Sequence, residues 1–177
     1  MAATGQGRAS ARVNVAGLGE TNVGTGVPVL DHLLAMMAVY ASFDLALEVE
    51  PGTSPEVEIT AAARSLGEVL AGPLRAEGVR GHGSAAFPVD EALAHVALEA
   101  SGRPLLVSNV DLSQARIAGL AGDLAARFLD ELVQTARLTL HVRLVEGSDT
   151  QHVLEAIFKA LGVALAQACR PRRREHE

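Results

Sequence analysis

A histidine and a glutamate near the C-terminus have the spacing of a metal-binding pair. In the stretch SDTQHVLEAIFKALG, residues 148–162, His152 and Glu155 are three positions apart. Side chains with this spacing lie on the same face of a helix. Imidazole nitrogen and carboxylate oxygen both bind divalent transition metals. The pair is therefore a candidate metal site, and the competing interpretation of His152 is a helix residue at a contact between subunits.

The residues around this pair predict a helix that follows a strand. Apolar side chains alternate over residues 139–145, as in a strand with one buried face. Residues 148–150 are Ser, Asp and Thr, which can cap the first backbone N–H groups of a helix. Apolar side chains then recur at Val153, Ile157 and Leu161. The candidate pair thus lies in the first turns of the predicted helix.

The same pattern of a strand and then a helix occurs earlier in the chain. Residues 44–67 align with residues 139–162 without a gap, at a constant offset of 95 positions. Gly67 falls on Gly162, and apolar residues alternate before both predicted helices. An internal match of this length indicates a duplicated structural unit.

A second, looser match pairs residues 28–37 with residues 87–96. It predicts a helix over residues 90–100, with Asp90 and Glu91 in its first turn. Acidic side chains are favoured there by the helix dipole, which gives both residues a structural explanation.

These elements predict an α+β fold built by tandem duplication of a β-β-α-type unit. We expect two sheets with helices packed on one face of each sheet. The repeats cover about residues 9–78 and 79–168, and no Pro- or Ser-rich linker separates them. The prediction is a single domain, followed by a disordered basic tail over residues 170–177.

The composition restricts the partners and the compartment. Hydrophobic residues make up 49% of the 177 residues, and the net charge of −6 argues against a general nucleic-acid binder. No apolar run is long enough for a membrane span, and the first residues lack the apolar core of a secretory signal. The single cysteine, Cys169, excludes an internal disulfide and suits a reducing compartment. We expect a cytoplasmic protein with no nucleic-acid or membrane partner.

Three stretches resemble the imidazoleglycerol-phosphate dehydratase family. They are GVPVLDHLLAMMAVYASFDL (26–45), SAAFPVDEALAHVALEASGRPLLV (84–107) and LTLHVRLVEGSDTQHVLEAIFKALGVAL (138–165). The resemblance implies the duplicated fold, which this family shares with a domain of a ribosomal protein. It also implies a role in histidine biosynthesis, where the family removes water from imidazoleglycerol phosphate. The implied assembly is a homo-oligomer, built from trimers into a shell of up to 24 subunits, with active sites between subunits.

The resemblance also implies two manganese ions, held by histidines and glutamates that lie largely in one HHxxE motif per half. In the second motif His152 and Glu155 remain as metal ligands, while Gln151 replaces the first histidine. In the first half no histidine occurs between His32 and His82, so that motif lacks its histidines. The chain therefore resembles a family member with a depleted metal site.

Two further family histidines are also replaced. Tyr40 stands at one of these positions, and we expect its ring to fill the space that the metal leaves. Arg127 stands at another, where a fixed positive charge would oppose a bound cation.

The remaining site residues also come from the resemblance. Glu91 and His32 are the catalytic candidates, and Arg103 and Lys159 are the candidates for binding the substrate phosphate. Guanidinium groups suit this role because they grip phosphate with two parallel hydrogen bonds. Each has a structural alternative: helix capping for the first two, and salt bridges between subunits for the others. The family's C-terminal PSxKG segment is absent, and Gly81 replaces an arginine of the family.

The missing ligands favour a catalytically inactive, metal-poor paralogue that keeps the fold and the oligomer surfaces. Such a chain could assemble with itself or with an active paralogue. Two alternatives remain: an active dehydratase with an altered or mononuclear metal site, and a metal-free binder of a small phosphorylated ligand. Bound manganese would separate the first alternative from the others.

Overall fold

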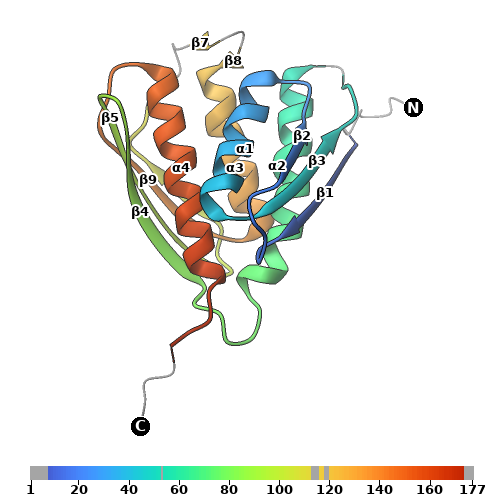
Figure 1. Cartoon of the computed structure of the whole chain (residues 1–177). Helices are drawn as coiled ribbons and strands as arrows, with labels where there is room; N and C mark the ends of the chain where they lie inside the picture. The colour runs from blue at the N-terminus through green and yellow to red at the C-terminus, as the bar shows by residue number, and fades with distance from the viewer. Residues whose placement is uncertain (1–7, 53, 113–115, 118–119, 174–177) are drawn as a thin grey trace.

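Four helices lie between two β-sheets in the computed structural model of the chain (Figure 1). The structure describes residues 8–52, 54–112, 116–117 and 120–173. The helices are α1 (Pro28–Ala41), α2 (Pro55–Leu74), α3 (Gly122–Ala136) and α4 (Thr150–Cys169). The strands are β1 (Ala9–Asn14), β2 (Thr21–Gly24), β3 (Asp44–Val49), β4 (His82–Val89), β5 (Ala92–Glu99), β6 (Leu105–Ser108), β7 (Arg116–Ile117), β8 (Leu120–Ala121) and β9 (Thr139–Glu146).

The two main sheets share one pairing pattern. The first has the order β1-β3-β2, with β3 antiparallel to β1 and parallel to β2. The second has the order β4-β5-β9-β6, with β9 antiparallel to β5 and parallel to β6. Strand β4 extends the second sheet by one antiparallel strand. This α+β arrangement, with helices on one face of each sheet, agrees with the predicted fold class.

All four helices run in the same direction, so their N-termini lie at one end of the molecule (Figure 1). Helix α1 is parallel to α4, because His32 is near Glu155 and, further along both helices, Tyr40 is near Lys159. Helices α2 and α3 form the other closely packed pair. We call the two ends of the molecule the helix N-terminal end and the helix C-terminal end.

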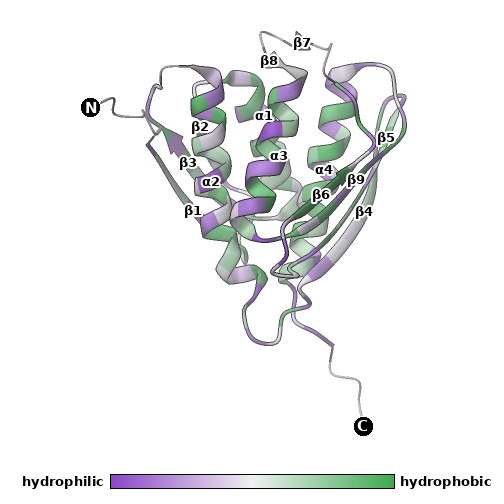
Figure 2. Ribbon diagram, turned by 180° about the vertical axis from the view of Figure 1, so that it is seen from behind, coloured by the Kyte–Doolittle hydropathy of each residue, from purple (hydrophilic) through white to green (hydrophobic). Residues whose placement is uncertain are grey.

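Glycines allow both helix pairs to approach closely. A Cβ atom on Gly162 of α4 would lie 2.2 Å from the carbonyl oxygen of Met37 in α1. A Cβ atom on Gly67 of α2 would lie 2.7 Å from Cβ of Thr135 in α3. These two glycines are the ones that align at the offset of 95 positions. Figure 2 shows hydrophobic residues along the helices, and Phe43, Phe128 and Phe158 are the largest fully buried side chains.

The helix predicted over residues 90–100 is wrong, because this segment forms a hairpin. Strands β4 and β5 pair in register from His82 opposite Glu99 to Val89 opposite Ala92. Asp90 and Glu91 make the turn, with Asp90 at a φ of 47°. The segment is a strand because every second residue is buried between the strands and α4: Ala92, Ala94, Val96 and Leu98. His95 accordingly lies exposed on β5.

The first residues of the predicted tail are held against the body of the protein. Val79 and Pro171 form an antiparallel bridge, and the backbone N–H of Arg172 donates to the carbonyl of Gly78 at 2.7 Å. This differs from the expectation of a disordered tail from residue 170. Residues 174–177 lie outside the described residues.

Helix α4 is long and apolar enough to span a membrane, judged by length and composition alone. In the structure 61% of its most apolar window is buried. It packs on α1 and on strands β4 and β5. Its hydropathy is therefore that of a core helix.

Candidate functional site

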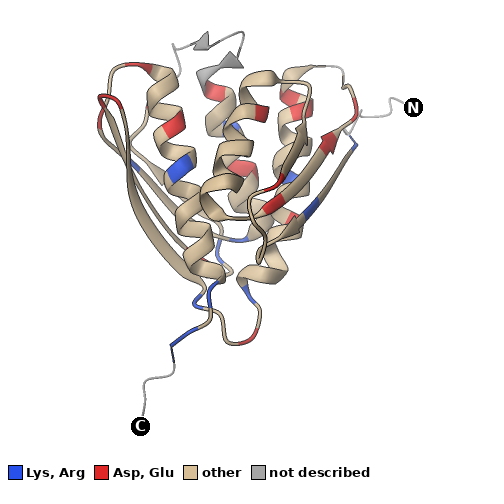
Figure 3. Cartoon of the chain, in the orientation of Figure 1, with Lys and Arg blue, Asp and Glu red and all other residues tan. Residues whose placement is uncertain are grey.

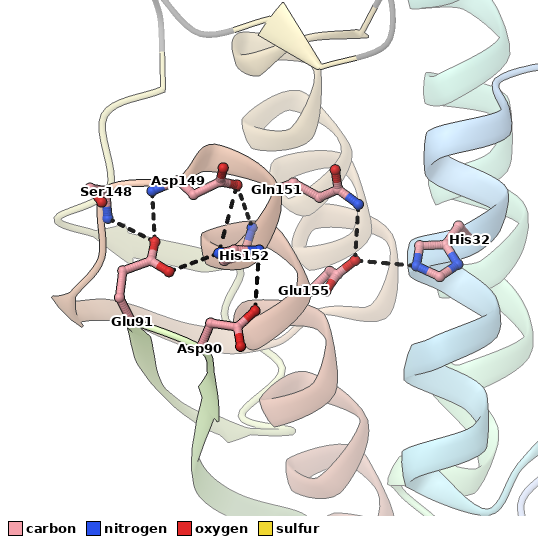
Figure 4. A network of polar contacts seen from close by, with 8 residues as sticks. All are labelled: His32, Asp90, Glu91, Ser148, Asp149, Gln151, His152 and Glu155. Carbon is pink, nitrogen blue, oxygen red and sulfur yellow. Dashed lines mark hydrogen bonds and ion pairs between the residues drawn. The ribbon is translucent and has the colours of Figure 1, made fainter.

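The N-terminus of α4 is capped twice, and both caps orient His152. Asp149 is the N-cap residue, and its side chain accepts the backbone N–H of His152 at 3.1 Å. The carboxylate of Glu91, in the β4–β5 turn, accepts the backbone N–H groups of Asp149 at 2.8 Å and of Ser148 at 3.3 Å (Figure 4). A helix N-terminus offers unpaired N–H groups and a positive dipole end, so both carboxylates stabilise it.

The imidazole ring of His152 lies among carboxylates. Its Nδ1 atom is 2.7 Å from Oε2 of Glu91, and its Nε2 atom is 3.3 Å from Oδ2 of Asp90. Oδ1 of Asp149 is 3.9 Å from Nδ1. Both ring nitrogens therefore have an acidic partner, and all three partners belong to the same chain.

These contacts shift two pKa values in opposite directions. The backbone N–H of Asp149, followed by the hydrogen bond from His152, lowers the pKa of Glu91 from 4.5 to about 2. The hydrogen bond to Glu91 raises the pKa of His152, and the charges of the nearby Asp and Glu side chains add to this. The arrangement therefore favours an imidazolium–carboxylate pair, in which both ring nitrogens carry protons.

Glu155 belongs to a separate group of contacts. Its Oε1 atom accepts a hydrogen bond from Nε2 of Gln151 at 3.3 Å and is 3.3 Å from Nε2 of His32. His32 comes from α1, so this group joins the first turns of α1 and α4. It lines a pocket of about 230 Å³ together with Pro28, Val29, Leu33 and Leu154.

The two predicted metal ligands therefore face different partners. His152 contacts Glu91 and Asp90, whereas Glu155 contacts His32 and Gln151 (Figure 4). Within the described residues, no three His, Cys, Asp or Glu side chains are arranged to hold a metal ion. The assignment of His152 and Glu155 as metal ligands therefore stays a prediction. The catalytic candidates Glu91 and His32 are likewise in separate groups.

Lys159 lies one turn further along α4 and contacts aromatic rings. Its Nζ atom is 5.1 Å from the ring centroid of Tyr40 and 5.7 Å from that of Phe87. The two rings meet edge to face at 4.9 Å. Both distances are within the range of a cation–π interaction. Tyr40 thus contacts Lys159, and the expectation that its ring fills the space of a lost metal stays a prediction.

Arg103 lies at the helix C-terminal end of the molecule. It follows β5 in a turn beside the start of β9. The hydroxyl groups of Ser101 and Thr139 donate hydrogen bonds to its carbonyl oxygen. The N-terminus of α4 lies beyond the opposite end of β9. No contact among the described residues joins Arg103 to Lys159, and their shared role in phosphate binding stays a prediction.

Sequence reasoning missed Asp90 as a partner of His152 and Glu91 as a helix cap. Both roles depend on the hairpin turn, which the alternation of small apolar residues after Glu91 could have indicated.

Comparisons with known proteins give a consistent result. The family model described as imidazoleglycerol-phosphate dehydratase matches residues 25–165. Imidazoleglycerol-phosphate dehydratase of Syntrophobacter fumaroxidans is 39% identical, over 94% of this chain and 86% of that protein. That of Pelobacter propionicus is 35% identical, over 94% and 87%.

Solved structures agree with these sequence matches. Imidazoleglycerol-phosphate dehydratase of Staphylococcus aureus superposes with a TM-score of 0.83 at 28% identity, covering 93% of this chain and 94% of that one. The Pyrococcus furiosus enzyme gives a TM-score of 0.85 at 26% identity, covering 99% and 96%.

Proposed function

The chain belongs to the imidazoleglycerol-phosphate dehydratase family of histidine biosynthesis, and from this premise we propose that it is a non-catalytic member. In this proposal the chain keeps the family fold and its assembly surfaces but not the dinuclear manganese site. The family is metal-dependent, so the side chains available to a metal decide between an active and an inactive member.

The contacts of His152 are the observation that carries the proposal. A histidine binds a metal through a neutral ring nitrogen with a free lone pair. Here the two ring nitrogens are 2.7 Å from Glu91 and 3.3 Å from Asp90. Manganese bound at Nε2 would have to replace the contact with Asp90, and manganese bound at Nδ1 would have to replace the contact with Glu91.

The residue types near His152 support the same conclusion. Gln151 stands where the family motif has a histidine, and its amide donates to Glu155 instead of binding a cation. Arg127, which replaces another family histidine, is exposed on α3. An amide and a guanidinium do not replace two imidazoles as ligands, because the guanidinium is always charged and has no acceptor.

Assembly is the function that such a member retains. Structures of the same family superpose over nearly the whole chain. The outer face of the second sheet, away from the helices, exposes the neighbouring apolar side chains of Leu105 and Val107 on β6 and, further along β9, that of Val145. Exposed apolar side chains on a sheet face support a role in assembly. We propose a trimer-based homo-oligomer, or co-assembly with an active paralogue, located in the cytoplasm.

Metal content measured together with turnover tests the proposal. The purified protein is incubated with excess manganese and desalted, and the retained metal is measured by elemental mass spectrometry. The expected result is almost no manganese and no dehydration of imidazoleglycerol phosphate. About two manganese ions per chain with measurable turnover would instead establish an active dinuclear enzyme.

A variant sharpens the result. Gln151→His restores the first histidine of the second motif and should retain more manganese than the natural chain. Equal retention by both proteins would show that the loss of this histidine is not what limits metal binding.

A further inference from the structure

Two exposed histidines lie close together on the outer face of the second sheet. His95 is on β5 and His141 is on β9, and both residues are exposed. The alternate residues of these strands, among them Val96 and Leu140, are buried on the side of the helices. The two histidines therefore lie on the face that the helices leave uncovered. Figure 3 shows this sheet largely in tan, the colour of residues other than Lys, Arg, Asp and Glu.

The register of the two strands makes these histidines diagonal neighbours. His141 is directly opposite Ala97 of β5, and Arg143 of β9 is directly opposite His95. Diagonal neighbours in an antiparallel pair have Cα atoms about 7–8 Å apart, within reach of aromatic and other long side chains. Ala97, the next outward residue after His95 on β5, is too small to separate the two rings. The sheet thus places two imidazoles where both can reach one ion.

The ring nitrogens of both histidines are available to a ligand. Within the described part of the chain, neither ring takes part in a hydrogen bond or an ion pair. His152 differs, because its two ring nitrogens contact Glu91 and Asp90. A neutral imidazole binds a metal through a free nitrogen lone pair. Two such rings on a paired backbone lose little conformational freedom when they share a ligand.

The charged neighbours of the two histidines on this face are one cation and one anion. Arg143 is directly opposite His95, and Glu99 is the other diagonal neighbour of His141 on β5. The long stem of Arg143 lets its guanidinium stay in water, away from a bound cation. The carboxylate of Glu99 offsets this positive charge, so the face does not repel a divalent ion.

We propose that His95 and His141 together bind a divalent transition metal ion such as Ni²⁺, Cu²⁺ or Zn²⁺. Imidazole nitrogen suits these ions, and affinity at such sites rises from Mn²⁺ through Ni²⁺ to Cu²⁺. The two rings take two coordination positions, and water fills the others. A site with two protein ligands agrees with the finding that no group of three His, Cys, Asp or Glu side chains among the described residues is arranged to hold a metal ion.

This site is separate from the manganese centre of the family. His152 and Glu155, the predicted manganese ligands, lie in α4, which packs on the opposite face of the second sheet. Manganese is also the ion that such nitrogen sites bind most weakly. The amount of manganese that the chain retains therefore leaves the inference unchanged.

Isothermal titration calorimetry of the full, untagged chain with nickel chloride tests the inference. His95→Gln and His141→Gln should each weaken nickel binding at least about tenfold, because each variant leaves a single imidazole and no chelate. His82→Gln is the matched control and should bind nickel as the natural chain does. His82 is exposed on β4 of the same sheet, opposite Glu99 and four residues along β5 from His95. Circular dichroism confirms that all variants are folded.

The alternatives give distinct results. Absence of nickel binding by the natural chain would overturn the inference. Two histidines that bind separately would lose bound nickel in each single variant at unchanged affinity, and that outcome would refute the shared site. A larger loss in Glu99→Gln than in His95→Gln would place the ion between Glu99 and His141, contrary to the proposal. Manganese retention should be the same in the natural chain and in all these variants, so the result does not depend on the proposed loss of the manganese centre.

Discussion

At the N-terminal end of α4, the ring of His152 lies between the carboxylates of Glu91 and Asp90. At the C-terminal end of the same helix, Arg170 and Arg80 line a pocket in which none of the described lining residues is acidic. Both ends collect charge that opposes the helix dipole, acidic at the first and basic at the second. They differ in what satisfies that charge.

The two ends therefore differ in how far their charges are paired within the chain. The charges at the N-terminal end neutralise one another within the chain, so an added cation must break existing contacts. The arginines at the C-terminal end take part in none of the ion pairs of the described residues.

Gly162→Ala should have the largest effect, because it disturbs the packing of α4 on α1 midway between the two ends of α4. The new methyl group would lie 2.2 Å from the carbonyl oxygen of Met37, so α1 and α4 must separate. We expect the free energy of unfolding to fall by about 3 kcal/mol, at the upper end of typical overpacking costs. Chemical denaturation measures this change.

Gly72→Ala provides the control for that variant. Gly72 lies in α2, and a methyl group added there would have no neighbouring atom within 4 Å beyond its own stretch of helix. Its unfolding free energy should stay within about 1 kcal/mol of the natural chain, since only helix propensity and local conformation change. Similar losses in both variants would show that helix separation is not the cause.

Glu91→Gln should have an intermediate effect that depends on pH. The lowered pKa of Glu91 means that its contribution is present above about pH 4.5 and is lost as the pH falls towards 2. The raised pKa of His152 means that its contribution is present below 6.5 and is lost as the pH rises through its folded value. The melting temperature of the variant should therefore be lowest, relative to the natural chain, between about pH 4.5 and 6.5.

Thermal melts across the pH range, followed by circular dichroism, check this profile. Glu48→Gln is the matched control, because Glu48 is exposed on β3, away from α4. Its melting temperature should differ little from that of the natural chain at every pH. A deficit for Glu91→Gln that does not change with pH would argue against the charged pair with His152.

Lys159→Gln should have the smallest effect. It removes the charge that lies 5.1 Å from the ring centroid of Tyr40, halfway between the two ends. A partly exposed cation–π contact contributes about 0.5–1 kcal/mol, so the unfolding free energy should fall by that amount. Tyr40→Phe keeps the ring and should match the natural chain in chemical denaturation. A loss in Tyr40→Phe as large as that in Lys159→Gln would point to the hydroxyl group.

Periodicity predicted most of the elements but failed at one segment. The strand-and-helix pairs at residues 44–67 and 139–162 are correct, because long segments with a clear apolar period leave little choice. Residues 90–100 are rich in alanine, which suits a helix by propensity, yet they form β5. Pairing with β4 and β9 buries one face of this strand, and that tertiary contribution outweighs the local preference.

The sequence by itself determined the family, the fold class, the N-cap at residues 148–150 and the paired glycines at the repeat offset. These follow from local pattern and from motifs read along the chain. Only the tertiary structure decided that Glu91 and Asp90 meet His152, that Glu155 meets His32, and that Arg80 joins Arg170. Each of these contacts joins residues distant in sequence, and their geometry depends on the turn of a hairpin, the packing of α1 on α4 and the pairing of the chain end with a loop.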